Sequence, residues 1–149
     1  MASISVQSDD FEVDAEIARI RADRTDIGAI VTFSGTVRDL DGKLKAMTLE
    51  HYPGMTEKEL ARVAADAEAR WPLNACRVIH RFGRLLPGDN IVLVVTASAH
   101  RQAAFEAAEY LMDFLKSKAP FWKLEESDDG DSGWVDAKET DDEALKRWQ

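Results

Sequence analysis

Basic side chains gather at two places in the sequence, one at each end of a long amphipathic segment. His100 and Arg101 stand at the first, in Ser98-Ala99-His100-Arg101, where an apolar run gives way to a helical pattern. A helix start offers free backbone N–H groups and the positive end of the helix dipole, so His and Arg there can bind an anion such as phosphate. The alternative is a solvated first turn, although cations at that end oppose the dipole and destabilise the helix. The motif alone leaves both interpretations open.

The second cluster consists of Lys116, Lys118 and Lys123, which bracket Ala119-Pro120-Phe121-Trp122. Cations stabilise the C-terminal end of a helix, so the presence of Lys116 and Lys118 there can be explained by helix stability alone. Lys123 is expected on a strand, and a lysine beside apolar walls loses its proton more readily and can act as an acid or base. The alternative is a lysine at the edge of the core that extends its ammonium group into water. Arg38 is expected at a strand end, where an arginine is usually solvated. It is a candidate site residue only if the fold brings it to these bases.

The sequence contains no motif for the common hydrolase, nucleotide-binding or metal sites. No GxSxG, P-loop or GxGxxG motif is present, and no HExxH, CxxC or EF-hand pattern accompanies the scattered His51, His80 and His100. We therefore expect neither a metal site nor a cofactor, the alternative being a three-histidine site assembled by the fold. Cys76 lies in the apolar run NACRVI and is expected to be a buried, inert thiol rather than a nucleophile.

Length and composition favour one cytoplasmic domain over residues 1–149. The chain has 149 residues, 45% of them hydrophobic and 32% charged, which is enough for a real core. The longest aliphatic run, 91–95, is far shorter than the ~20 residues that span a membrane. The first residues lack the basic start and apolar stretch of a secretory signal. A single cysteine excludes an internal disulfide, which suits the cytoplasm.

The net charge of −9 argues against nucleic-acid binding. The charge is uneven, because residues 124–143 hold one base, Lys138, and ten acids: Glu125, Glu126, Asp128, Asp129, Asp131, Asp136, Glu139, Asp141, Asp142 and Glu143. Most of the lysines and arginines precede that stretch, so a local basic pocket is compatible with the acidic total.

Periodicity and turn signals predict an α+β domain with mostly antiparallel strands. Strands are expected at 4–7, 29–37, 45–52, 76–82, 90–97, 121–125 and 133–138, and helices at 14–24, about 56–71, 98–118 and 141–148. Thr56 and Glu59 are expected to form a capping box, and Ser98 to cap the long helix. The apolar face of that helix is expected to comprise Ala104, Phe105, Ala108, Leu111, Met112 and Leu115.

Four segments in a fixed order carry a resemblance to a known family. GAIVTFSGTVRD, LEHYPGM, IHRFGRLLPGD and SAHRQAAFEAAEYLMDFLKSKAPFWK follow one another along the chain. Together they closely resemble the large, catalytic subunit of molybdopterin synthase, over roughly residues 28–148. The resemblance implies an α/β-hammerhead fold with an additional antiparallel β subdomain. It also implies a homodimer that carries a small ubiquitin-like subunit at each end, giving a heterotetramer.

The resemblance implies sulfur transfer to a pterin phosphate. The family converts cyclic pyranopterin monophosphate (precursor Z) to molybdopterin, taking sulfur from a thiocarboxylate on the C-terminal Gly-Gly of the small subunit. The motif match implies that Lys116 and Lys123 are catalytic, and that the following residues bind substrate: Arg38, His100, Arg101, Met112 and Lys138. The rival hypotheses are a non-catalytic adaptor for a ubiquitin-like tail and a phosphate-ester-binding enzyme.

The spacing of these residues sets a geometric condition. Fifteen residues separate Arg101 from Lys116, which places their backbones ~22 Å apart on a straight helix, too far to surround one small pterin. If both serve one site, a two-fold dimer must bring the helix start of one chain to the helix end of its mate. We therefore expect a site shared between protomers.

Overall fold

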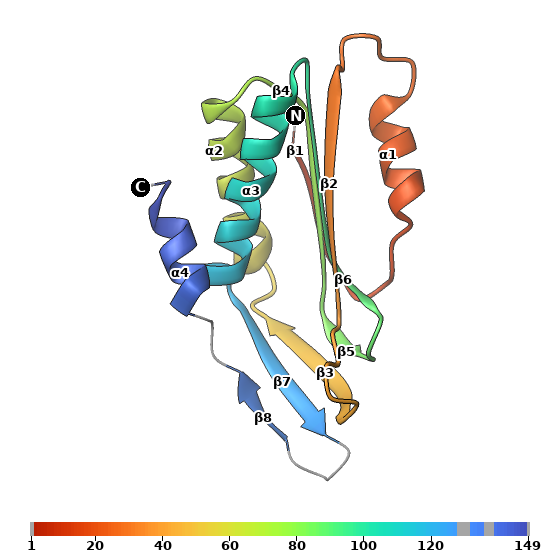
Figure 1. Ribbon diagram of the computed structural model, residues 1–149, viewed down its shortest axis with the longest axis vertical. Coiled ribbons are helices and arrows are strands. Elements are labelled where there is room, and N and C mark those ends of the chain that lie inside the picture. The colour runs from red at the N-terminus through yellow and green to blue at the C-terminus, as the bar shows by residue number, and fades with distance from the viewer. Residues whose placement is uncertain (1, 128–131, 136–138, 149) are drawn as a thin grey trace.

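The computed structural model describes residues 2–127, 132–135 and 139–148. Its first sheet, sheet A, has the strand order β1 (Ala2–Gln7), β4 (Leu73–Arg81), β6 (Asn90–Ser98) and β2 (Ala29–Thr36). β1 runs parallel to β4, whereas β6 is antiparallel to both of its neighbours. Figure 1 shows sheet A as the central layer, with helices on both sides.

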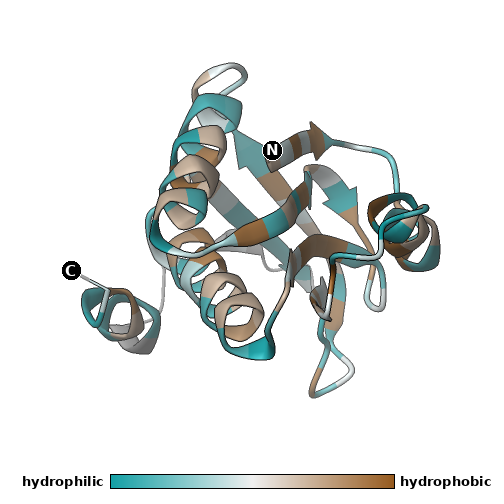
Figure 2. Ribbon diagram, turned by 90° about the horizontal axis from the view of Figure 1, so that it is seen from above, coloured by the Kyte–Doolittle hydropathy of each residue, from teal (hydrophilic) through white to brown (hydrophobic). Residues whose placement is uncertain are grey.

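The strand β6 is the most deeply buried element. All residues from Val92 to Ser98 are buried, so both faces of the strand are covered. On one face Val94 belongs to the core formed with α2 (Met55–Arg70) and α3 (Arg101–Ser117). On the other face Val95 packs with Phe11 and is bordered by residues of α1 (Val13–Arg21). In the end-on view of Figure 2 the hydrophobic segments accordingly line the space between helices and sheet.

A buried hydrogen bond attaches α3 to this strand. The hydroxyl of Thr96 donates to the carbonyl of Ala104 over 2.6 Å, and both residues are fully buried. The buried stripe of α3 consists of Ala104, Ala107, Ala108, Tyr110, Leu111 and Phe114. Phe105, expected on the apolar face, is instead 59% exposed, because it lies outside that i, i+3, i+4 stripe.

The second sheet, sheet B, is antiparallel throughout. Its order is β5 (Gly83–Leu85), β3 (Leu44–His51), β7 (Phe121–Ser127) and β8 (Ser132–Val135). A separate small core of Val37, Met47, Leu49 and Leu85 lies against it. The expectations of an α+β fold and of an additional antiparallel β unit are confirmed.

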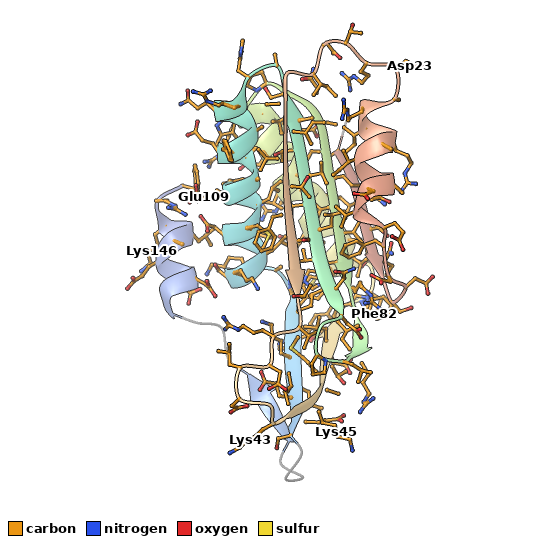
Figure 3. All side chains as sticks on the ribbon, turned by 45° about the vertical axis from the view of Figure 1, so that its right-hand side comes forward. Asp23, Lys43, Lys45, Phe82, Glu109 and Lys146 are labelled. Carbon is orange, nitrogen blue, oxygen red and sulfur yellow. The ribbon has the colours of Figure 1, made fainter. Side chains whose placement is uncertain are left out.

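The last helix, α4 (Glu139–Lys146), packs beside α3. Arg147 forms ion pairs with Glu109 and Asp113 on α3, over 2.6 and 2.8 Å, and the indole N–H of Trp148 donates to Asp113. Figure 3 labels Glu109 and Lys146 on these neighbouring helices. Among the described residues, no helix is long and apolar enough to cross a membrane.

The expected cap of the long helix is wrong. Ser98 is the last residue of β6, and its hydroxyl donates to the carbonyl of Pro72 over 2.7 Å. His100 occupies the N-cap position in an extended conformation, and α3 begins at Arg101. A hydroxyl that already donates to the Pro72 carbonyl is not available to cap a helix, which explains the shift.

The expected capping box of α2 is also wrong. Thr56 lies within the first turn, where its hydroxyl accepts from the Tyr52 amide and donates to the Pro120 carbonyl. The reach-back contact comes instead from Glu57, whose carboxylate accepts the Gly54 N–H over 2.9 Å. Thr56 therefore links α2 to the segment that leads into β7.

Several element bounds differ from the sequence prediction. The first strand begins at Ala2, α1 ends at Arg21, and α4 begins at Glu139. The three-residue β5 was not predicted, because it is too short to show an alternating pattern. The expected last strand overlaps β8, and its remainder, 136–138, lies outside the described residues.

Gly28 provides a test of the close packing where β2 begins. A Cβ at this position would lie 2.1 Å from the carbonyl oxygen of Ala99, and the Gly28 N–H itself donates to Ser98. We expect Gly28→Ala to lower the free energy of unfolding by about 1–3 kcal/mol, because the β2–β6 backbone must shift. Urea denaturation measures this difference.

Gly133→Ala is the matched control, because a Cβ there meets nothing within 4 Å. Equal stability of the two variants would contradict the close approach of Gly28 to Ala99.

Candidate functional site

A cavity of about 710 Å³ lies where the two sheets meet the end of α3. Its wall comes from β2 and β6 of sheet A, β3 and β7 of sheet B, and the last turns of α3. In Figure 1 this junction is found where the chain passes from α3 into β7. The volume is typical of a site for a small molecule.

Apolar side chains form one part of the cavity wall. It includes Met47, Leu49, Ile91, Val92, Met112 and Leu115. The register of β2 with β6 shifts between Gly35 and Thr36, which also line the cavity. Such a bulge bends a strand locally, and here it ends two residues before Arg38. The apolar wall strengthens any electrostatic contact made inside it.

Cationic side chains from different elements converge on this cavity. Arg38 follows β2, Lys116 lies in the last turn of α3, and Lys123 lies on β7. Because side chains alternate along a strand, Phe121, Lys123 and Glu125 face the cavity. Among the described residues, neither Arg38 nor Lys123 has an ion-pair partner within 4.0 Å. These two cations are therefore suited to hold an anion.

Acidic groups stand at the rim. Glu125 is exposed at the outer end of the β7 face, and Asp141 comes from α4. The carbonyl of Asp141 accepts a hydrogen bond from the Ser117 hydroxyl over 2.9 Å, so α4 is fastened to the end of α3 at the cavity. The cavity lining thus holds carboxylates as well as cations, and of the three cations Lys123 is half-buried while Arg38 and Lys116 are exposed.

His80 is a buried polar residue of the cavity wall that the sequence analysis did not assign to the site. It is 7% exposed, and its ring stacks on Phe121 with centroids 3.7 Å apart. Burial lowers the pKa of His80 from 6.5 to about 4, opposed by a hydrogen bond to the Arg81 carbonyl and reinforced by the charges of Lys116 and Lys123. The imidazole is therefore neutral at neutral pH. The only sequence signal was a histidine at the end of an apolar strand.

The structure brings part of the expected site together. Arg38, Met112, Lys116 and Lys123 all line the cavity. His100 and Arg101 do not, because they lie exposed at the opposite end of the unbroken helix α3. Their backbones are therefore ~22 Å from that of Lys116. The last expected substrate-binding residue, Lys138, lies outside the described residues.

The histidines do not gather around a common point. His51 packs against Phe82, with ring centroids 4.3 Å apart, and against Phe121. Figure 3 labels Phe82 close to the junction of the two sheets. His80 stacks on Phe121, and His100 is at the far end of α3. In the described part of the chain, no three His, Cys, Asp or Glu side chains form a group that could hold a metal ion.

Comparisons with known proteins give a consistent result. The family model described as MoaE protein matches residues 6–118. The chain is 60% identical over 148 residues to a molybdopterin synthase catalytic subunit of Mesorhizobium japonicum, covering 99% of this chain and 93% of that protein. The fold is similar to that of a molybdopterin biosynthesis MoaE protein from Burkholderia ambifaria, with a TM-score of 0.85, 54% identity, and 99% and 98% of the two chains covered. It is also similar to a molybdopterin synthase structure from Staphylococcus aureus, with a TM-score of 0.77, 31% identity, and 90% and 96% covered.

Cys76, which belongs to the core and does not line the cavity, gives a test of burial. The thiol is 1% exposed, and burial raises its pKa to about 12. We expect iodoacetamide at pH 8 to alkylate the folded protein at least ~100-fold more slowly than the urea-unfolded protein, because only the thiolate reacts. Mass spectrometry counts the adduct, and the single cysteine makes the assignment unambiguous. Similar rates in the two states would show that the thiol is accessible.

Proposed function

The chain belongs to the MoaE family of molybdopterin synthase catalytic subunits, and we propose that the cavity between its two sheets is the site of that synthase's reaction. The protein is an enzyme of molybdopterin biosynthesis. The observation that carries the proposal is the convergence of Arg38, Lys116 and Lys123 on one cavity of small-molecule size. The names of the relatives favour a catalytic role over that of an adaptor.

The proposed substrates are both anionic where they meet the protein. Precursor Z carries a cyclic phosphate, and the sulfur arrives as the thiocarboxylate at the end of a small ubiquitin-like subunit. Cations at an apolar wall hold such groups by charge-assisted hydrogen bonds. The donor supplies its own nucleophilic sulfur, so the chain needs no catalytic cysteine, which agrees with the burial of Cys76.

The two lysines have separate proposed roles. Lys116, exposed at the end of α3, meets the carbonyl of the donor tail and assists sulfur transfer. Lys123 lies half-buried on β7, where it acts as an acid–base group or stabilises charge at the pterin. Arg38 and Met112 contact the substrate from the facing walls.

A second copy of the chain completes the proposed site. The rigid helix α3 separates Arg101 from Lys116, so one chain cannot present both to one pterin. In a two-fold dimer, His100 and Arg101 of one protomer add their anion-binding groups to the cavity of the other. With one small subunit at each end, the assembly is a heterotetramer.

The remaining expectations belong to the same proposal. A single domain over 1–149 is supported by relatives that align with nearly the whole chain. A separate small subunit is supported by the name catalytic subunit that the relatives carry. A cytoplasmic location is supported by the lone, buried cysteine. Lys138 is proposed to bind substrate on the motif match alone.

Reconstitution of the reaction tests both the proposed function and the catalytic roles of Lys116 and Lys123. The chain, incubated with precursor Z and the thiocarboxylated small subunit, is expected to form the dithiolene of molybdopterin. Lys116→Ala and Lys123→Ala are expected to lower this rate by ~10²–10⁴-fold, since each removes a positioned charge or proton donor. Lys43→Ala, an exposed lysine outside the cavity, is the matched control. Near-normal rates of either cavity variant with saturating small subunit would refute its assignment.

Subunit exchange tests the shared site. Arg101→Ala and Lys116→Ala are each expected to be inactive, but a mixed dimer has one site with both defects and one with neither. Random exchange makes about half of the dimers mixed, so about a quarter of wild-type activity is expected to return. Differently tagged chains verify the exchange. Verified exchange without recovered activity would rule out a site made by two protomers.

A further inference from the structure

His80 presents an unused hydrogen-bond acceptor to the cavity. Its Nδ1 lies 2.9 Å from the carbonyl oxygen of Arg81, and because a carbonyl only accepts, Nδ1 must carry the proton. The neutral ring then has an unprotonated Nε2. The described residues place no donor within hydrogen-bond distance of it, although the side chain is buried and lines the cavity. Because the ring lines the cavity, this nitrogen is suited to accept a hydrogen bond from a donor that enters or lines the cavity.

The stacking of His80 on Phe121 indicates which donor is in reach. The two rings are nearly parallel, at 17°, so one face of the imidazole is covered and its edge remains for the cavity. Phe121 and Lys123 point to the same face of β7. Alternate residues of a strand lie about 7 Å apart, a spacing that the four-carbon chain of a lysine can bridge. Lys123 can therefore deliver its ammonium group to the edge of the ring stacked on Phe121.

We propose that Nε2 of His80 accepts a hydrogen bond from the ammonium group of Lys123 when substrate fills the cavity, and that His80 is thereby a positioning residue for sulfur transfer. The inference rests on the proposed function, because His80 acts through a lysine assigned there to the reaction. His80 itself does not touch the substrate.

The charges around the ring show why Lys123 needs such a partner. Lys116 faces His80 from α3, Lys123 from β7 and His51 from β3, and Glu125 and Asp141 stand at the rim. The like charge of Lys116 disfavours an approach of the Lys123 ammonium group to it, and Glu125 lies on the same face of β7 as Lys123. A neutral acceptor at the inner wall offers this ammonium group a hydrogen bond without cancelling the positive charge that holds the anionic substrates.

Nitrogen NMR of the imidazole tests the contact without relying on turnover. In the free protein, His80 is expected to show a protonated Nδ1 and a pyridine-like Nε2. The probe complex contains precursor Z and the small subunit with an ordinary carboxylate tail, which cannot donate sulfur. In this complex the Nε2 signal is expected to shift toward the hydrogen-bonded value, and Lys123→Met is expected to abolish the shift. The comparison variant Lys116→Met is expected to retain it.

Each contrary NMR result overturns the proposal. A protonated Nε2 in the free protein removes the acceptor. An unchanged Nε2 signal in a complex whose backbone signals show saturation removes the contact. A shift that depends on Lys116 rather than Lys123 assigns the wrong donor.

Kinetics test the positioning role. His80→Phe keeps a ring to stack on Phe121 but removes the acceptor, and we expect kcat to fall about 10- to 100-fold with KM for precursor Z nearly unchanged. His80→Gln restores an acceptor and is expected to recover part of kcat. His51→Phe, which alters the same aromatic cluster outside the cavity wall, is the control and is expected to stay near wild-type activity.

The outcomes separate this inference from the proposed function. Normal kcat in His80→Phe, or equal loss in His80→Phe and His80→Gln, would overturn the positioning role alone. A rise in KM with kcat unchanged would instead make His80 a substrate contact. Full activity of Lys123→Ala would overturn the assignment of Lys123 in the proposed function and this inference with it. If His80→Phe does not fold, the NMR of the wild-type protein still decides.

Discussion

The burial of β6 on both faces is the constraint on which the rest of the structure depends. A strand covered on both sides must be apolar along its whole length, and Val92 to Ser98 meet this condition with Thr96 as an interior polar exception. The Thr96 hydroxyl is satisfied by the Ala104 carbonyl, so the exception fixes α3 to the sheet. The anchored helix then runs to its last turn at the junction with sheet B. Core packing thus decides where Lys116 is placed.

The same anchor has a consequence for assembly. A straight helix of 17 residues carries chemically useful side chains at both ends and holds them apart. Within one chain, its C-terminal end meets Arg38 and Lys123 at the cavity, while its N-terminal end is exposed. The rigidity that positions Lys116 therefore prevents Arg101 from joining it. The proposed site therefore combines two copies, each of which would offer one end of the helix to the other.

The sequence predicted the elements well and the local contacts less well. Hydrophobic periodicity located β6, α3, β3 and β7, because these depend on burial along many residues, whereas the three-residue β5 was missed. The caps were missed because the hydroxyls of Ser98 and Thr56 have distant partners, Pro72 and Pro120, which spacing does not reveal. Motif resemblance placed Lys116 and Lys123 at one site, and the fold brings both to the cavity. His80 was missed because its importance comes from stacking on Phe121, which lies 41 residues further along the chain.

The chemical character of His80 also explains how an acidic chain keeps a cationic cavity. The net charge is −9, and the segment that follows Lys123 is rich in Asp and Glu. Carboxylates are therefore the most abundant side-chain hydrogen-bond acceptors near Lys123 in the sequence. A carboxylate at the inner wall would pair with a lysine and cancel charge needed for phosphate and thiocarboxylate. A protonated imidazole would repel that lysine. Burial prevents protonation of His80 at neutral pH, and the Arg81 carbonyl fixes its proton on Nδ1, so the remaining nitrogen accepts a hydrogen bond and adds no charge. In the proposed site, a neutral acceptor inside the cavity therefore orients Lys123 and leaves its charge available to the substrates.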